Sequence, residues 1–140
     1  MIVSKEQISN YIPHRTPFVM LDGLKIVEGK NFETTFEVSK GNILVDDNGD
    51  FSTPGLIENI AQSCALGLGF INSKDGEKPK EGFIGAVSKL EAFSNPKIGD
   101  VITTKVEVIQ ELGPLVLVQG SSYINDQKLL SCEMKVVTAP

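Results

Sequence analysis

Residues 53–70 read TPGLIENIAQSCALGLGF, and their pattern predicts one long helix. Thr53 can cap its start, and Pro54 suits a first helical position because its missing N–H is not needed there. Apolar side chains then recur at helical spacing: Ile57, Ile60, Ala61, Cys64, Ala65 and Leu68. Gly67 and Gly69 each cost about 1 kcal/mol of helix propensity relative to alanine. So many small residues indicate close approach by other backbone, and we expect a sheet wrapped around this helix.

Glu58 lies in the second turn of this mostly apolar helix. Burying a carboxylate without a partner is costly, so Glu58 needs a partner or a chemical task. Gln62 follows one turn later on the same side and can hold the carboxylate. Two interpretations stay open at this point: a carboxylate that acts on a ligand, and a structural one held by hydrogen bonds at a subunit interface.

Composition limits the classes of function. The 140 residues have a hydrophobic share of 41% and a net charge of −5, which argues against nucleic acid as the main partner. An acidic carrier protein would need a local basic patch, for which Arg15 is the only arginine and lysines would supply the rest: Lys78, Lys80, Lys89 and Lys97. One histidine and two distant cysteines make a metal site improbable, and no cofactor-binding motif is visible.

Targeting signals are not visible either. No run approaches the 18 or so apolar residues that indicate a membrane span, and there is no signal peptide, so we expect a cytoplasmic protein without a membrane segment. Cys64 and Cys132 sit in apolar stretches. Buried free thiols are therefore favoured over a disulfide.

The rest of the pattern predicts an α+β architecture in one domain over residues 1–140, with one antiparallel sheet curled around the central helix. In chain order we expect a short helix over 4–12, strands over 18–28 and 31–38, a loop over 41–52, the long helix, a loop over 72–81, and strands over 82–90, 101–111, 115–124 and 128–137.

Four motifs in register resemble the 3-hydroxyacyl-acyl-carrier-protein dehydratases. Residues 12–22, IPHRTPFVMLD, resemble their N-terminal signature, and 58–62, ENIAQ, resemble the start of their central helix. Residues 82–86, GFIGA, and 131–134, SCEM, resemble two of their later strands, with Phe93, Pro96, Gly99 and Asp100 fitting the intervening turn. A looser resemblance links the acidic loop before the helix to the dehydratase-like proteins of aryl-polyene and related pigment pathways.

The resemblance implies the hotdog fold and a lyase of fatty-acid or polyene biosynthesis, which dehydrates 3-hydroxyacyl thioesters in an active site at a dimer interface. In such enzymes a histidine from a loop ahead of the helix acts as the base, and the helix carboxylate handles the leaving hydroxyl. This chain departs from the pattern, because residues 44–53 contain no histidine and Gly55 lies only three residues ahead of Glu58. Glu58 therefore transfers from the family, whereas the usual base does not.

Two substitutes for the base stay open. His14 is the only imidazole, and histidine is the usual base near neutral pH; a structural role or a place in the tunnel wall is its alternative. Asp46, Asp47 and Asp50 could offer a carboxylate, although their pattern favours a solvated loop. For substrate contacts the resemblance selects six positions: Gly55, Gln62, Phe83, Gly85, Ala86 and Phe93.

Three functions are compatible with these observations. The first, which the resemblance favours, is a hydro-lyase that acts on a thioester of acyl carrier protein or coenzyme A. The second is a non-catalytic subunit that binds acyl thioesters or completes the dimer of an active paralogue. The third is a hotdog thioesterase whose helix carboxylate activates water. A homodimer or larger assembly, or a heterodimer with the paralogue, is the expected state.

Overall fold

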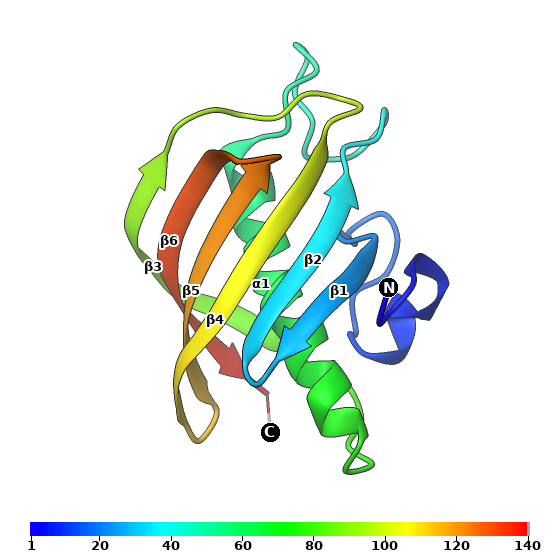
Figure 1. The fold of residues 1–140 in the computed structure, drawn as a ribbon, viewed down its shortest axis with the longest axis vertical. Coiled ribbons are helices and arrows are strands. Elements are labelled where there is room, and N and C mark those ends of the chain that lie inside the picture. Colours follow the sequence, from blue (N-terminus) through cyan, green and yellow to red (C-terminus); the bar gives the residue numbers. More distant parts are fainter. Residues whose placement is uncertain (140) are drawn as a thin grey trace.

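The computed structural model of the chain describes residues 1–139 and shows six antiparallel strands curled around one long helix (Figure 1). The elements are η1 (Lys5–Asn10), β1 (Gly23–Glu28), β2 (Asn31–Glu37), α1 (Thr53–Ser73), β3 (Gly82–Ala92), β4 (Val101–Leu112), β5 (Leu115–Ile124) and β6 (Gln127–Thr138). The strand order is β1-β2-β4-β5-β6-β3, which makes β1 and β3 the edges. The predicted hotdog architecture is confirmed.

The inner face of the sheet packs on α1. Burial alternates along β2 and β4, so that Phe32, Thr34 and Phe36 face the helix together with Ile102 and Val106. This is the period of two that a half-buried strand requires. The buried face of α1 includes Leu56, Ile60 and Leu66, which lie in the same core.

The glycines of α1 are positions of close approach, as the sequence predicts. A Cβ on Gly67 would lie 2.2 Å from Cγ of Phe32, a residue of β2. A Cβ on Gly69 would lie 2.3 Å from the backbone oxygen of Tyr11, which follows η1. The N-terminal segment therefore closes over the second half of the helix. Cys64 and Cys132 are buried and free, as predicted.

Some predicted boundaries are wrong. Ser52, rather than Thr53, caps α1, because its hydroxyl accepts a hydrogen bond from the Gly55 N–H at 3.2 Å. The strand predicted over 18–28 begins only at Gly23, because side chains of α1 take the backbone hydrogen bonds that a strand would form around Met20. The short helix is a 3₁₀ helix, and α1 continues to Ser73.

The two edges of the sheet differ in their cover. The β1 edge is paired with the N-terminus, since the Leu24 N–H donates to the Val3 oxygen at 3.0 Å. The β3 edge has no further strand within residues 1–139.

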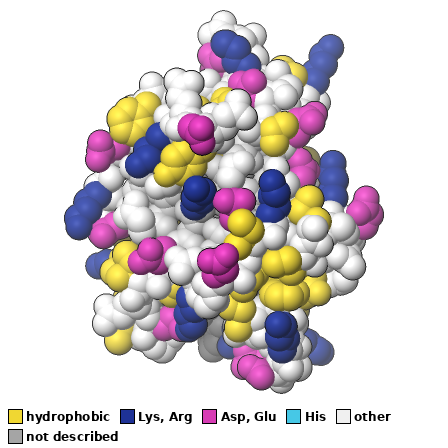
Figure 2. All heavy atoms as spheres, in the orientation of Figure 1, with side chains coloured by type: hydrophobic (Ala, Val, Ile, Leu, Met, Phe, Trp, Pro, Cys, Tyr) yellow, Lys and Arg dark blue, Asp and Glu magenta, His cyan; other side chains and the backbone are white. Residues whose placement is uncertain are grey.

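On the outer face of the sheet, side chains of both charges are interspersed with separate apolar groups (Figure 2). No helix in the described part of the chain combines the length and apolarity needed to cross a membrane.

Candidate active site

Glu58 projects from the first half of α1 with 35% of its side chain exposed. Its Oε1 accepts a hydrogen bond from Gln62 Nε2 at 3.0 Å, which is the contact that the one-turn spacing predicts. The Nε2 of His14 lies 3.7 Å from the same oxygen. The fold thus brings together a carboxylate and the one imidazole of the chain, although 44 positions separate them in the sequence.

The segment that carries His14 is fastened to α1. The Met20 N–H donates to Gln62 Oε1 at 2.7 Å, and Gln62 Nε2 donates to the Phe18 oxygen at 2.8 Å. Arg15 adds local order, because its Nη1 donates to the oxygens of Ile12 and His14, each at 2.8 Å. Gln62 therefore holds both the carboxylate of Glu58 and the segment that places the imidazole.

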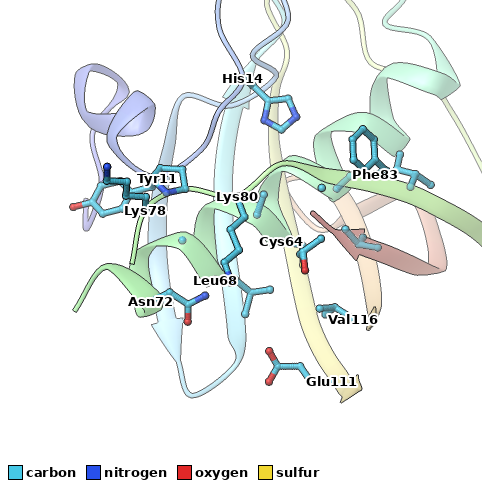
Figure 3. Close-up of a pocket in the computed structure, with 18 of the residues that line it drawn as sticks. Tyr11, His14, Cys64, Leu68, Asn72, Lys78, Lys80, Phe83, Glu111 and Val116 are labelled. Carbon is cyan, nitrogen blue, oxygen red and sulfur yellow. The ribbon is translucent and has the colours of Figure 1, made fainter. Parts of the chain in front are cut away.

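A cavity of about 410 Å³ begins at Glu58 and His14 and follows α1 toward its C-terminal end. This volume is within the usual range of small-molecule sites. Its helix wall consists of small or apolar residues: Ala61, Cys64, Ala65, Leu68 and Gly69. Strands supply the opposite wall through Gly82, Phe83, Ile84, Val116 and Val136. Figure 3 shows His14 at one end of the cavity and the polar side chains of Asn72 and Glu111 at the other.

Cys64 also lines the cavity, with 1% of its surface exposed. Burial raises the pKa of its thiol from 9.0 to about 12. The thiolate is the nucleophilic form of cysteine, so Cys64 stays an inert wall residue at neutral pH. The candidate acid–base groups at the end of the cavity where it begins are Glu58 and His14.

Comparison with known proteins places this geometry in a family. The ApeP-like family, described as ApeP dehydratase, matches residues 6–140. The chain belongs to this family. The 3-hydroxyacyl-[acyl-carrier-protein] dehydratase FabZ of Clostridium kluyveri is 31% identical over 92% of this chain and 91% of its own. The FabZ of Clostridium acetobutylicum is 30% identical over 96% of each chain.

The same fold occurs in the solved dehydratase heterocomplex ApeI:P from Xenorhabdus doucetiae. The TM-score is 0.89, with 15% identity over 95% of this chain and 91% of that one. At this identity the likeness shows the fold alone. The family match confirms both resemblances, to the FabZ-type dehydratases and to the ApeP branch of aryl-polyene pathways.

The acidic loop ahead of α1 does not reach the cavity lining. Asp46 Oδ1 accepts the backbone N–H groups of Asn48 and Asp50, at 2.9 and 3.0 Å. Asp50 Oδ1 in turn accepts Lys97 Nζ at 2.6 Å. These carboxylates serve the fold of the loop, which leaves His14 as the imidazole next to Glu58.

The other predicted contact residues lie at different places. Phe83 lines the cavity, whereas Gly85, Ala86 and Phe93 lie along or just beyond β3 outside its lining. Gly55 packs beneath the ring of Phe51, to which an added Cβ would come within 2.6 Å. The sequence interpretation assigned no role to Asn59, which is fully buried and bonds to the His14 segment; an amide inside an apolar helix face was its only signal.

Proposed function

We propose that this chain dehydrates a 3-hydroxyacyl thioester of the aryl-polyene type, with His14 and Glu58 sharing the proton transfers. One observation carries the proposal: Nε2 of His14 lies 3.7 Å from Oε1 of Glu58 at the end of a cavity whose helix wall consists of small or apolar residues. That separation is longer than a hydrogen bond, but catalytic contacts often tighten only when substrate binds.

The proposed reaction follows from these two groups. His14 takes a proton from C2 of the acyl group, and the Glu58 carboxyl gives a proton to the hydroxyl on C3. The C3–O bond breaks, the C2–C3 double bond forms, and water leaves. His14 then holds one proton more and Glu58 one less, and direct return of the proton between neighbouring groups restores both.

The carrier that we propose is an acyl carrier protein, the carrier in the names of the FabZ relatives. Lys78 and Lys80 line the cavity and take part in none of the ion pairs among residues 1–139. Lys89 and Lys97, by contrast, pair with Glu133 and Asp50. The two free lysines offer an acidic carrier a basic contact beside the cavity.

We also propose that the chain works in complex with a paralogous dehydratase chain. Within residues 1–139 no strand pairs with the outer edge of β3, and this edge and the residue just beyond it expose Val87, Leu90 and Phe93, which are 36%, 44% and 59% accessible. Exposed apolar edges of this kind are typical of interaction surfaces. The heterocomplex ApeI:P, in the same fold, supports a paralogue as the neighbour.

The test is a dehydration assay on a 3-hydroxyacyl thioester of acyl carrier protein, run also in the hydration direction. We expect Glu58→Gln and His14→Ala each to lower kcat by about 10²–10⁴-fold, the range that acid–base groups contribute. The matched control is Asp47→Asn, which also converts a carboxylate to an amide but lies in the loop outside the cavity. It should leave kcat unchanged.

Alternative outcomes separate the three functions. If wild type is inert alone and with its paralogue, while thioester binding persists, the chain is a binding subunit. Release of free thiol without enoyl product would identify a thioesterase. Turnover that survives both substitutions would overturn the assignment of His14 and Glu58.

A further inference from the structure

A row of buried hydroxyls crosses the inner face of the sheet beneath α1. Thr34 of β2 lies opposite Thr104 of β4, and Thr104 lies opposite Ser122 of β5. All three side chains are fully buried, as are Asn59 and Ser63 of the helix above them. Polar groups in an apolar core are costly unless they are hydrogen-bonded, so the partners of this row show what each member supports.

The three hydroxyls have different partners. Thr34 shares a hydrogen bond of 2.7 Å with Ser63, whose hydroxyl also donates to the Asn59 backbone oxygen. The hydrogen bonds that start at Thr34 therefore end within α1. The Ser122 hydroxyl has no partner within residues 1–139. Thr104 donates to the Asn59 side-chain oxygen at 2.5 Å. Of the three hydroxyls, only Thr104 starts a chain of hydrogen bonds that continues beyond the helix.

Asn59 connects Thr104 by hydrogen bonds to the segment that carries His14. Its Nδ2 donates to the Met20 oxygen at 2.8 Å. Because Thr104 occupies the oxygen end of the amide, the NH₂ end must face Met20. The backbone of Met20 is thus held at both polar groups, by Asn59 at its oxygen and by Gln62 at its N–H.

We propose that Thr104 and Asn59 are positioning residues for the pair of Glu58 and His14, acting through the backbone oxygen of Met20. The inference rests on the proposed function of that pair. Neither Thr104 nor Asn59 lines the cavity, so neither touches substrate there. Their effect is on the position of His14, whose Nε2 lies 3.7 Å from Glu58 Oε1, a separation at which a small shift ends the contact.

The kinetic test compares Thr104→Val with Thr34→Val. Both changes remove one buried hydroxyl from adjacent positions of the same row, and both keep the shape of the side chain. We expect Thr104→Val to lower kcat by about 10²-fold, as a misplacement of about 1 Å does, with KM little changed. Thr34→Val should leave kcat near wild type, and Thr104→Ser, which keeps the donor, should retain most of it.

A second readout does not depend on turnover. His14 is the only histidine, so its ring signals in an NMR spectrum of the isotope-labelled chain report one site. Glu58→Gln gives the signals of His14 without its charged neighbour. We expect Thr104→Val to displace the His14 signals and to weaken their response to Glu58→Gln, whereas Thr34→Val leaves both unchanged.

The outcomes separate the two proposals. Displaced His14 signals in Thr104→Val, with a wild type that is inert both alone and with its paralogue, would support the positioning role and reject the dehydratase assignment. Equal effects of Thr104→Val and Thr34→Val on both readouts would make Thr104 an ordinary core residue and overturn the inference. If Thr104→Val fails to fold, Thr104→Ala and Thr34→Ala replace the pair with the same expectations, since alanine also removes the hydroxyl donor.

Discussion

The Glu58 carboxylate is held in one orientation and is also accessible to solvent. Gln62 holds its Oε1 at 3.0 Å, yet 35% of the side chain remains exposed toward the cavity. Glu111, the other carboxylate that lines the cavity in the described part of the chain, pairs instead with Lys30. Glu58 is therefore the carboxylate that a cavity ligand can reach without breaking a lysine pair.

The two cysteines are placed so that burial suppresses their chemistry. Burial raises the pKa of Cys64 to about 12 and that of Cys132 to about 11, from 9.0. Because the thiolate is the reactive form, we expect neither thiol to react with an aromatic disulfide reagent at pH 8 in the native state. In denaturant both should react. A thiol that reacts rapidly in the folded chain would contradict the burial of that cysteine.

At the scale of elements, α1 depends on small residues where the N-terminal segment crosses it. A Cβ on Gly69 would come within 2.3 Å of the backbone oxygen of Tyr11, which cannot move aside as a flexible side chain would. Alanine has the better helix propensity by about 1 kcal/mol, but overpacking of a core typically costs about 1–3 kcal/mol. We expect Gly69→Ala to lower the free energy of unfolding, measured by urea denaturation.

Gly85→Ala is the matched control for that substitution. A Cβ on Gly85 of β3 would meet Val137 Cγ2 at 3.4 Å and the Lys135 oxygen at 3.6 Å, which are ordinary contacts. Its free energy of unfolding should stay within about 0.5 kcal/mol of wild type. A Gly69→Ala variant as stable as this control would show that the Tyr11 segment does not press on the helix.

The type and order of the elements could be predicted from the sequence, because apolar periodicity reports which face of an element is buried. The strand predicted over 18–28 shows the limit of that reasoning. Residues 18–22 are apolar enough for a strand, but the hydrogen bonds of Met20 go to Gln62 and Asn59, two side chains of α1. Periodicity carries no information about such long-range bonds, so the true start at Gly23 could not be predicted.

The candidate site likewise combines one contact that the sequence predicts with others that it does not. The contact between Glu58 and Gln62 is local, one helical turn apart, and the sequence predicts it. The approach of His14 to Glu58 depends on where the N-terminal segment crosses α1, which no local pattern specifies. Asn72 of α1 and Glu111 of β4 both line the cavity, at the end away from His14 (Figure 3). They meet there because the sheet curls around the helix.

At the scale of the whole molecule, the two edges of the sheet predict one surface for assembly. The β1 edge is hydrogen-bonded to residues 2 and 3 of the same chain. The β3 edge is long, largely exposed and rich in apolar side chains. An edge of that kind is a template for pairing with another strand, and soluble proteins otherwise protect it with charges. The assembly that we propose would therefore be built on β3.

A lysine on β3 tests this surface. Val87 is 36% exposed on β3, and Val101 is 48% exposed on β4, an interior strand of the sheet. Val87→Lys places a charge where a second strand would pair, so we expect sedimentation velocity to show single chains, both for the purified protein and after mixing with a paralogous dehydratase chain. Val101→Lys adds the same charge elsewhere and should leave the assembly intact. An assembly that survives Val87→Lys but not Val101→Lys would move the interface from the β3 edge to the outer face of the sheet.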